Sequence, residues 1–273
     1  RTTSAVPSYN KSMWVSDFDG DGDNEILSTD SRKVIYLLNE ANDVYTQSWV
    51  YPYTLPTEGT IRQVIPVQYD EDLAEEILIA TEYGISVIPS LNEPAINILT
   101  TTESITVVDV ADLDLDGEQE LIYLAADKIN IVSLNNTDTQ MFSIDALGSD
   151  DFSIGNTDSD LQLEIVLSAG AIYDGMSYIN EWFSSTKFGN SIVVTGDLDG
   201  DGVDEIAGTD SWGDITIFSA DDKSQIASFD NFHTCTLAIE NIDNDVNDEL
   251  IVGDCQWGNI TAYDLSNSSL VEQ

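Results

Sequence analysis

The sequence predicts an all-β fold, a β-propeller of about six four-stranded blades in one domain that spans residues 1–273. An acidic nine-residue motif occurs six times, alternating apolar stretches flank the copies, and helical periodicity is absent. The copies start 51, 44, 44, 41 and 44 residues apart, and roughly 44 residues is the size of one four-stranded blade. This spacing favours repeated blades over an all-helical solenoid.

The six copies follow the form Asp-x-Asp-x-Asp-Gly-x-x-Glu and are numbered here as loops one to six in chain order. The form is complete in loops one, three and five, which occupy residues 17–25, 112–120 and 197–205. Loops two, four and six are altered; they begin with Gln or Asn, lack the sixth-position Gly, and occupy residues 68–76, 156–164 and 241–249. This alternation indicates a duplicated two-blade unit and favours an even number of blades.

Each loop is expected to join the first two strands of a blade. Short alternating stretches precede five of the loops, at residues 13–16, 64–67, 107–110, 193–196 and 237–240. A turn, often with glycine, then leads to a third strand and a less regular fourth one, such as 45–50 or 225–229. A closed six-bladed ring is the simplest fit; part of a seven- or eight-bladed ring and an open array remain as alternatives.

The charge of the chain is strongly negative. Its 51 acidic and 8 basic residues give a formal net charge of −43, which repels phosphate backbones and anionic membrane surfaces, so nucleic acid is not an expected partner. No apolar run approaches the roughly 18 residues of a spanning helix, so membrane insertion is not expected. The chain begins with Arg1, and we expect it to be a module of a longer protein. The six loops hold 27 of the 51 acidic residues, which favours cation binding over a merely solvated acidic surface.

The residue types of the loops match the chemistry of calcium. Calcium takes six to eight oxygen ligands at about 2.3–2.6 Å, and alternate residues of a tight loop can supply them. Positions one, three and five offer carboxylates, position seven a backbone carbonyl, and position nine a carboxylate from the start of the next strand. Carboxylates about 4 Å apart repel by about 4 kcal/mol at an effective dielectric of 20, so these loops need a cation to close.

Three calcium sites are therefore expected in the complete loops, and up to six in all. The expected ligands are Asp17, Asp19, Asp21, the carbonyl of Asp23 and Glu25; Asp112, Asp114, Asp116, the carbonyl of Glu118 and Glu120; and Asp197, Asp199, Asp201, the carbonyl of Val203 and Glu205. The altered loops either bind weakly or merely turn, and their candidates are Gln68, Asp70, Asp72 and Glu76; Asn156, Asp158, Asp160 and Glu164; and Asn241, Asp243, Asp245 and Glu249. An EF-hand is excluded because position twelve is Ser28, Tyr123 or Gly208 and the flanks are β.

These loops and their flanks resemble the FG-GAP/VCBS family of calcium-loop repeats, which includes the integrin α-subunit propeller and many secreted bacterial proteins. The similarity covers all six units, and residues 14–29 (WVSDFDGDGDNEILST) and 193–209 (VVTGDLDGDGVDEIAGT) match the family pattern best. Position nine is Glu where the family more often has Asp, and the Phe-Gly and Gly-Ala-Pro landmarks are missing, which favours the VCBS-like branch.

The resemblance implies that partners dock on the face opposite the calcium loops. The aromatic residues expected on that face are Trp49, Tyr51, Tyr53, Tyr83, Trp212 and Trp257. Aromatic side chains at such turns also cap the packing between blades, and this alternative stays open.

Cys235 and Cys255 lie symmetrically about the centre of loop six, so a disulfide across antiparallel strands is favoured over two free thiols. A disulfide fits an oxidising exterior. We therefore expect an extracellular module, secreted or on a cell surface, that serves adhesion or the recognition of a protein or glycan. The alternative is a calcium-stabilised polysaccharide-active enzyme, a lyase or a glycosidase. This chain is poorly equipped for catalysis, because His233 is its single histidine and is expected at a strand edge.

Overall fold

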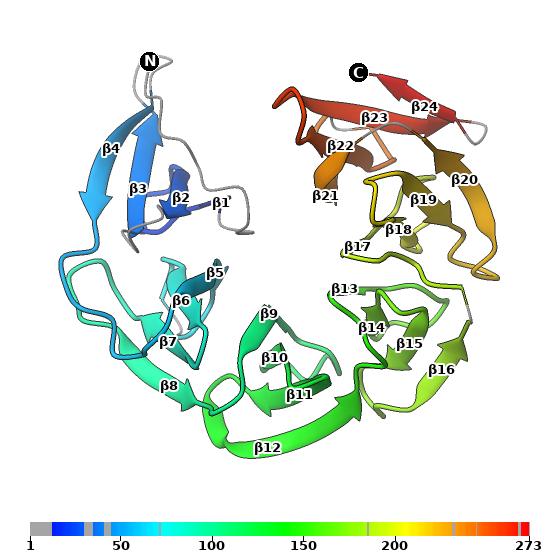
Figure 1. Ribbon diagram of the computed structural model, residues 1–273. Coiled ribbons are helices and arrows are strands. Elements are labelled where there is room, and N and C mark those ends of the chain that lie inside the picture. The colour runs from blue at the N-terminus through cyan, green and yellow to red at the C-terminus, as the bar shows by residue number, and fades with distance from the viewer. Residues whose placement is uncertain are drawn as a thin grey trace. The chain divides into compact units, whose positions relative to one another are not determined.

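A computed structural model describes residues 13–29, 35–40, 45–70, 72–184, 186–230, 233–243, 245–266 and 269–272. These residues form six four-stranded sheets in chain order (Figure 1), and the fold is that of β-propeller blades without helices in the described residues. Within each sheet the strands neighbour one another in sequence order. Pairing is antiparallel, as between β17 and β18 and between β18 and β19.

The bounds of the strands are as follows. The first three blades contain β1 Met13–Ser16, β2 Glu25–Thr29, β3 Ile35–Glu40, β4 Tyr45–Val50; β5 Ile61–Val67, β6 Glu76–Thr81, β7 Gly84–Ile88, β8 Ile96–Thr100; and β9 Ile105–Ala111, β10 Glu120–Ala125, β11 Lys128–Ser133, β12 Asn136–Asp145. The last three contain β13 Phe152–Gly155, β14 Glu164–Leu167, β15 Ala171–Asp174, β16 Asn180–Phe183; β17 Ile192–Gly196, β18 Glu205–Thr209, β19 Ile215–Phe218, β20 Gln225–Phe229; and β21 Thr234–Glu240, β22 Glu249–Asp254, β23 Ile260–Ser266, β24 Ser269–Glu272.

Burial differs between the strands of a blade for a reason visible in the sequence. The second strands are short apolar runs, and every residue of β6, β14 and β18 is buried, as expected where both faces of a strand are covered. The fourth strands are more exposed, most clearly β16, where all four residues face solvent. The second strand, which begins with the ninth residue of the loop, is therefore firmly anchored in its blade.

The chain divides into two compact units. The first comprises residues 1–110, 119–126 and 130–141, and the second comprises 111–118, 127–129 and 142–273. Side chains of β5 to β7 pack on β9 to β11 in the core of the first unit, with Leu78, Ile85 and Ile105 fully buried. In the second unit β17 to β19 pack on β21 and β22, with Ile215 and Leu250 fully buried.

The strand positions agree with the sequence-based expectation in most places. The fourth strands expected at 45–50 and 225–229 are β4 and β20. The first strands of blades two, three and six begin two or three residues earlier than expected. The expected strands did not include these residues because they are polar or break the alternation. The last strand, β24, covers 269–272.

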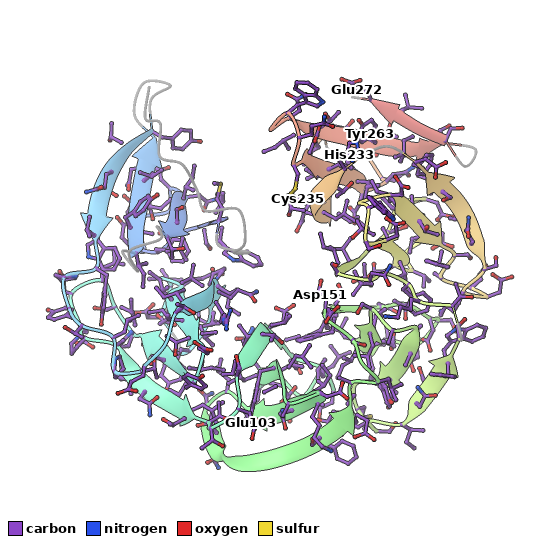
Figure 2. The ribbon with its side chains drawn as sticks, viewed as in Figure 1. Glu103, Asp151, His233, Cys235, Tyr263 and Glu272 are labelled. Carbon is purple, nitrogen blue, oxygen red and sulfur yellow. A yellow bond between two sulfur atoms is a disulfide. The ribbon has the colours of Figure 1, made fainter. Side chains whose placement is uncertain are left out.

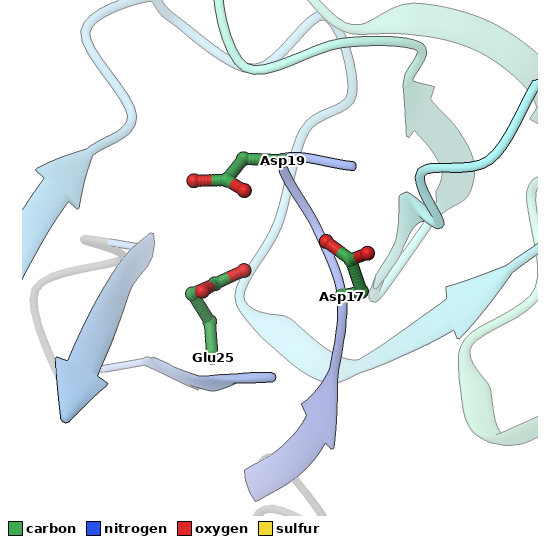
Figure 3. Close-up of side chains that lie close together, drawn as sticks. All are labelled: Asp17, Asp19 and Glu25. Atoms are coloured by element: carbon green, nitrogen blue, oxygen red, sulfur yellow. The ribbon is translucent and has the colours of Figure 1, made fainter. Parts of the chain in front are cut away.

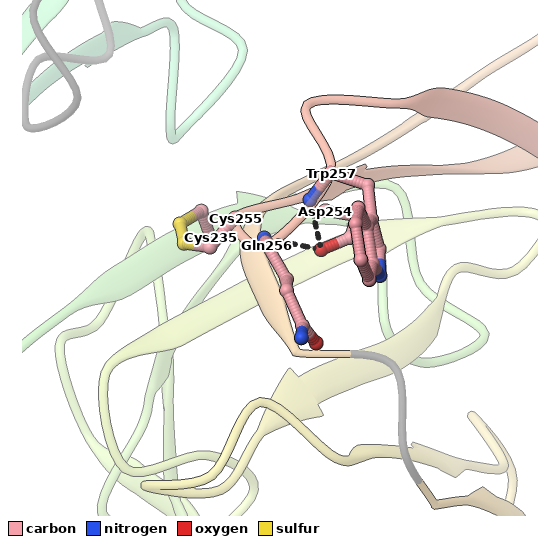
Figure 4. Close-up of a disulfide and its surroundings, with 5 residues drawn as sticks. All are labelled: Cys235, Asp254, Cys255, Gln256 and Trp257. Atoms are coloured by element: carbon pink, nitrogen blue, oxygen red, sulfur yellow. Dashed lines mark hydrogen bonds between the residues drawn. A yellow bond between two sulfur atoms is a disulfide. The ribbon is translucent and has the colours of Figure 1, made fainter.

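Cys235 and Cys255 form the expected disulfide in blade six (Figure 4), with their Cα atoms 5.3 Å apart. Cys235 lies at a register shift of β21, between the pairs Thr234 with Asp254 and Thr236 with Gly253. His233, which precedes β21 (Figure 2), has an exposed side chain, and its carbonyl accepts the Cys255 N–H at 3.1 Å. The bridge closes a 20-residue loop, and a loop of that length contributes about 3 kcal/mol by the chain-entropy argument.

Candidate metal centres

All six acidic loops join the first and second strands of their blades, and the ninth residue of each loop is the first residue of the second strand. These ninth residues are all glutamates, and each is buried although it is ionisable. They are Glu25, Glu76, Glu120, Glu164, Glu205 and Glu249. Because a buried carboxylate is costly unless it is paired or bound to a metal, their burial needs a physical reason.

Carboxylates converge at several of these loops. In blade one, Asp17, Asp19 and Glu25 each place an oxygen within 4.8 Å of the other two (Figure 3). Further groups that meet this criterion are Asp70, Asp72 and Glu76; Asp197, Asp199 and Glu205; and Asp158, Glu164 and Glu181. Glu181 lies outside the repeated motif, on β16. Loop three is divided between the two compact units. Residues Asp112 to Glu118 belong to the second unit, and Glu120 belongs to the first.

The complete loops share one hydrogen-bond pattern around the first aspartate. The carboxylate of Asp197 accepts the backbone N–H groups of Gly200, Asp201 and Gly202 at 2.7, 3.0 and 2.8 Å. Asp17 accepts the equivalent three N–H groups in loop one, and Asp112 accepts those of positions five and six in loop three. A turn with successive N–H groups pointing inward is a site for an anionic group, and here the first aspartate occupies it.

Glycine at position six makes this turn possible. Gly202 has φ +91° and the corresponding Gly22 has φ +93°, values that side chains with a Cβ rarely adopt. Position four also has positive φ in the complete loops, and in loop three it is a leucine, Leu115, at φ 60°. The backbone therefore turns its N–H groups toward position one.

The altered loops reverse the direction of this hydrogen bond. The side-chain amide of Asn156 donates to the carbonyl of Asp160 at 3.3 Å, and that of Gln68 donates to Asp72 at 3.2 Å. Their sixth residues are Leu or Val, and these have no positive φ. The carbonyl of position five therefore faces position one, which explains why an amide with a donor replaces the aspartate there.

Loop six shows a further consequence of this reversal. Asn241 Nδ2 donates to the carbonyl of Asp245 at 2.8 Å and also to that of Asn247 at 3.2 Å. Asn247 is position seven, whose carbonyl is an expected ligand in the complete loops. In this arrangement the amide of Asn241 uses an oxygen that a cation would need.

Electrostatics distinguish the ninth glutamates from ordinary carboxylates. Burial, followed by the charges of Asp199 and Asp201, raises the pKa of Glu205 to about 7. Burial also raises the pKa of Glu164 to about 7, although the N–H of Thr157 acts in the opposite direction. Burial is the main cause of the raised pKa of Glu25 and Glu76 as well.

Some of these buried oxygens have no donor. Glu205 Oε2, Glu164 Oε1 and Glu249 Oε1 accept no hydrogen bond from the described residues. A buried oxygen without a donor costs about 1–3 kcal/mol or more when it is charged, and a cation beside it removes that cost. Hard, all-oxygen carboxylate groups of this kind fit calcium better than a transition metal.

The sequence reasoning missed the residue at position eight. In blade five, Asp204 Oδ2 accepts the N–H of Asn156 at 2.9 Å, and the Asp204 N–H donates to the carbonyl of Asn156 at 2.7 Å. Asp248 makes the same two contacts with Asp197, at 3.1 and 2.8 Å. The eighth residue of one blade therefore fixes the first loop residue of the preceding blade, which a motif search within one repeat does not show.

Lys223 was also missed. It lies between β19 and β20, and its Nζ donates to the carbonyl of Thr157, which belongs to loop four of the preceding blade. Only the tertiary structure brings these two segments together, because they are 66 residues apart in sequence.

The aromatic residues expected on a partner face differ in exposure. Trp212 and Trp257 are 78% and 74% exposed. They lie on turns where the carboxylates of Asp210 and Asp254 accept their backbone N–H groups, and Figure 4 shows the turn of Trp257. Tyr53 and Tyr83 are exposed to a smaller extent. Tyr51 packs in the core and accepts the Ala95 N–H at 2.8 Å, and Trp49, which is half-buried, donates to the carbonyl of Leu91 at 2.9 Å. The exposed part of this set is thus concentrated at the two tryptophans.

A small cavity of about 200 Å³ adjoins loop one. Asp19 lines it together with Asp72 and Glu76 of loop two and with residues 90–92 of the turn between β7 and β8. The same acids belong to the carboxylate groups described above, so this cavity is part of the candidate metal centres.

Comparisons with known proteins bear on the fold. The sequence matches no protein-family model and no curated protein. Among solved structures, BBS1N in complex with ARL6DN is similar with a TM-score of 0.71 and 13% identity, over 98% of this chain and 84% of that one. A chain of the mitotic checkpoint complex is similar with a TM-score of 0.66 and 12% identity, over 97% of this chain and 78% of that one. At this identity the similarity shows the β-propeller fold. In the described part of the chain, no helix has the length and apolar character needed to cross a membrane.

Proposed function

We propose that this protein is a calcium-binding β-propeller module that recognises a protein or glycan outside the cell. The observation that carries the calcium proposal is the set of buried ninth glutamates, which converge with loop aspartates within 4.8 Å in several loops. Three of them, Glu164, Glu205 and Glu249, keep an oxygen without a donor among the described residues. Two such oxygens belong to glutamates whose pKa burial raises to about 7. The chain itself offers few cations to these loops, since it has 8 basic residues against 51 acidic ones.

The residues that would hold calcium are those of the complete loops. In loop one they are Asp17, Asp19, Asp21 and Glu25 with the carbonyl of Asp23, and loops three and five offer the same positions. A bound divalent cation would neutralise the converging carboxylates. The chain's own contribution is to hold the first aspartate through its backbone N–H groups and to present the ninth glutamate from the start of a buried strand.

The recognition role rests on surface chemistry. Trp212 and Trp257 are both largely exposed on similar turns of neighbouring blades, after β18 and β22, and exposed tryptophans are enriched at binding surfaces. One of the similar solved structures is a complex of BBS1N with ARL6DN, which is a precedent for a propeller with a protein partner. The disulfide and the calcium loops both favour an oxidising, calcium-rich exterior.

Calcium removal tests this proposal. At a calcium concentration ten times the dissociation constant, each site adds about 1.4 kcal/mol and three sites add about 4 kcal/mol, so excess EDTA should lower the melting temperature by about 10 °C. Asp199→Asn should remove one bound calcium, measured by equilibrium dialysis with atomic emission, whereas Asp230→Asn, on an exposed residue outside the loops, should remove none.

An unchanged melting curve after EDTA treatment of the loaded protein would contradict the calcium proposal. A glycan-array screen with and without calcium, together with a reducing-sugar assay, separates the recognition role from the alternative. Turnover of a polysaccharide, abolished by one carboxylate change outside the six loops, would identify an enzyme instead.

A further inference from the structure

Loop four has a lysine ammonium directly against it. Lys223 occupies the turn between β19 and β20, where its N–H donates to the carbonyl of Ser219 at 3.1 Å and its φ is 57°. From this turn Nζ donates to two backbone carbonyls, that of Ala220 in the same turn and that of Thr157 in loop four. The ammonium is thus fixed by backbone contacts on both sides.

The surroundings of this ammonium are acidic. Asp158, Glu164 and Glu181 place oxygens within 4.8 Å of one another. Burial lowers the pKa of Lys223, and the negative charges of Asp158, Glu164 and Glu181 act against this shift. Glu164 is fully buried, and its Oε1 has no hydrogen-bond donor among the described residues. This group of carboxylates therefore includes a buried oxygen that needs a positive charge, and the ammonium of Lys223 is bound to the same loop through the carbonyl of Thr157.

Loops one and three have no such lysine at the corresponding place. The turn between β7 and β8 adjoins loop one, where residues 90–92 line a cavity together with Asp19, and these residues are Ser, Leu and Asn. In blade four the turn after β15 approaches loop three through Gly175, at which a Cβ would lie 3.1 Å from that of Leu113. The turn of the following blade thus lies beside the loop in each case, and in blade five it carries a cation.

We propose that Lys223 supplies the cation of loop four, so that its ammonium takes the place that calcium has in the complete loops. Loop four then closes without metal, and removal of the lysine exposes a divalent-cation site made of Asp158, Glu164, Glu181 and the carbonyl of Thr157. Glu181, which comes from the outer strand β16, replaces the acid that loop four lacks at position one. The comparison with the complete loops rests on the proposed calcium function.

Counting bound calcium in Lys223→Met tests the inference. The variant should bind one calcium more than the wild type in equilibrium dialysis, and Lys223→Arg, which keeps the positive charge, should bind the wild-type number. Lys128→Met is the matched control, because Lys128 is exposed and pairs with Asp145 at 3.2 Å away from the loops. Adding Glu181→Gln to Lys223→Met should abolish the extra calcium.

The outcomes separate this inference from the calcium proposal. Equal calcium numbers in a loaded wild type and in Lys223→Met would overturn the inference alone. A wild type without calcium would overturn the proposed function, and a calcium that appears only in Lys223→Met would then still support the inference. No calcium in either protein would overturn both.

A second measurement needs no variant. In the folded wild type, acetylation of Lys223 by acetic anhydride, followed by peptide mass spectrometry, should be about tenfold slower than that of Lys128 or Lys187, because the half-buried Nζ of Lys223 is held by two backbone carbonyls and is shielded from the reagent. Lys187 is exposed and lies in the same unit as Lys223. Equal rates at the three lysines would overturn the placement of the ammonium.

Discussion

Loops four and five lie in consecutive blades and solve the same electrostatic problem in different ways. Both end in a buried glutamate whose pKa burial raises to about 7 and which keeps one oxygen without a donor. Loop five has an aspartate at position one that accepts three backbone N–H groups. Loop four has Asn156, which donates to a backbone carbonyl, and a lysine from the next blade.

The difference shows that two positions of the motif change together for a stereochemical reason. Gly202 allows a positive φ that turns N–H groups inward, where a carboxylate can accept them. Leu161 does not adopt that conformation, so a carbonyl faces inward and an amide is the better residue at position one. Loss of the glycine and loss of the first aspartate are thus one structural change.

The largest expected effect concerns pH. Because the folded-state pKa of Glu164 and Glu205 is raised from 4.5 to about 7, protonation favours the folded metal-free protein. The contribution of these two glutamates to the free energy of unfolding is then fully present below pH 4.5 and is lost as the pH rises through about 7. Each glutamate should contribute about 3 kcal/mol to this loss, measured by urea unfolding in EDTA between pH 4.5 and 8.

Calcium and two matched variants turn this pH dependence into a test of the comparison. In EDTA, Glu205→Gln and Glu164→Gln should each remove the part of the pH-dependent loss of stability that is due to the substituted glutamate. Calcium should remove the part due to Glu205, because a divalent cation favours the ionised form, and should leave the part due to Glu164. If calcium removed both parts equally, loops four and five would not differ in their source of cation.

A smaller effect is expected from exchanging the sixth residues. Gly202→Val should destabilise the protein in EDTA by about 2 kcal/mol, because valine is strained at positive φ, and it should also remove one bound calcium. A Cβ at position 202 would have no neighbour within 4 Å, so the cost would come mainly from the backbone. Unfolding in urea and calcium counting measure the two effects.

Leu161→Gly is the matched change in loop four. Leu161 is exposed, so its loss should cost less than about 1 kcal/mol and should leave the calcium number unchanged. A loss of calcium in Leu161→Gly, or none in Gly202→Val, would break the distinction between the two loops.

An effect smaller than that of Gly202→Val is expected at the contact that joins loops five and six. Asp248→Ala removes the carboxylate that accepts the Asp197 N–H and should cost about 1 kcal/mol, since a charged acceptor is lost while repulsion among nearby acids is relieved. Calorimetry should show weaker calcium binding at loop five and unchanged binding at loop one. Asp230→Ala, on an exposed residue, is the control, and an equal effect of both variants would contradict a positioning role for Asp248.

Much of the fold followed from local pattern. The period of the acidic motif predicted six four-stranded blades, and the loop pattern predicted that position nine lies at the start of the next strand, as it does in the structure. The sequence did not predict Glu181, Lys223 or the acids at position eight as partners of these loops. Each of them acts on a loop from another strand or from the following blade, and the spacing within one repeat carries no information about such contacts.

The sequence by itself determined where the six loops lie and, through Gly, Leu or Val at position six, which way each backbone turns. These are local properties, because they depend on the φ that a residue allows and on the donors or acceptors of its close neighbours. Only the tertiary structure decided which charges face each loop. Lys223 reaches Thr157 across 66 residues of sequence, and such a distance is closed by the packing of one blade on the next.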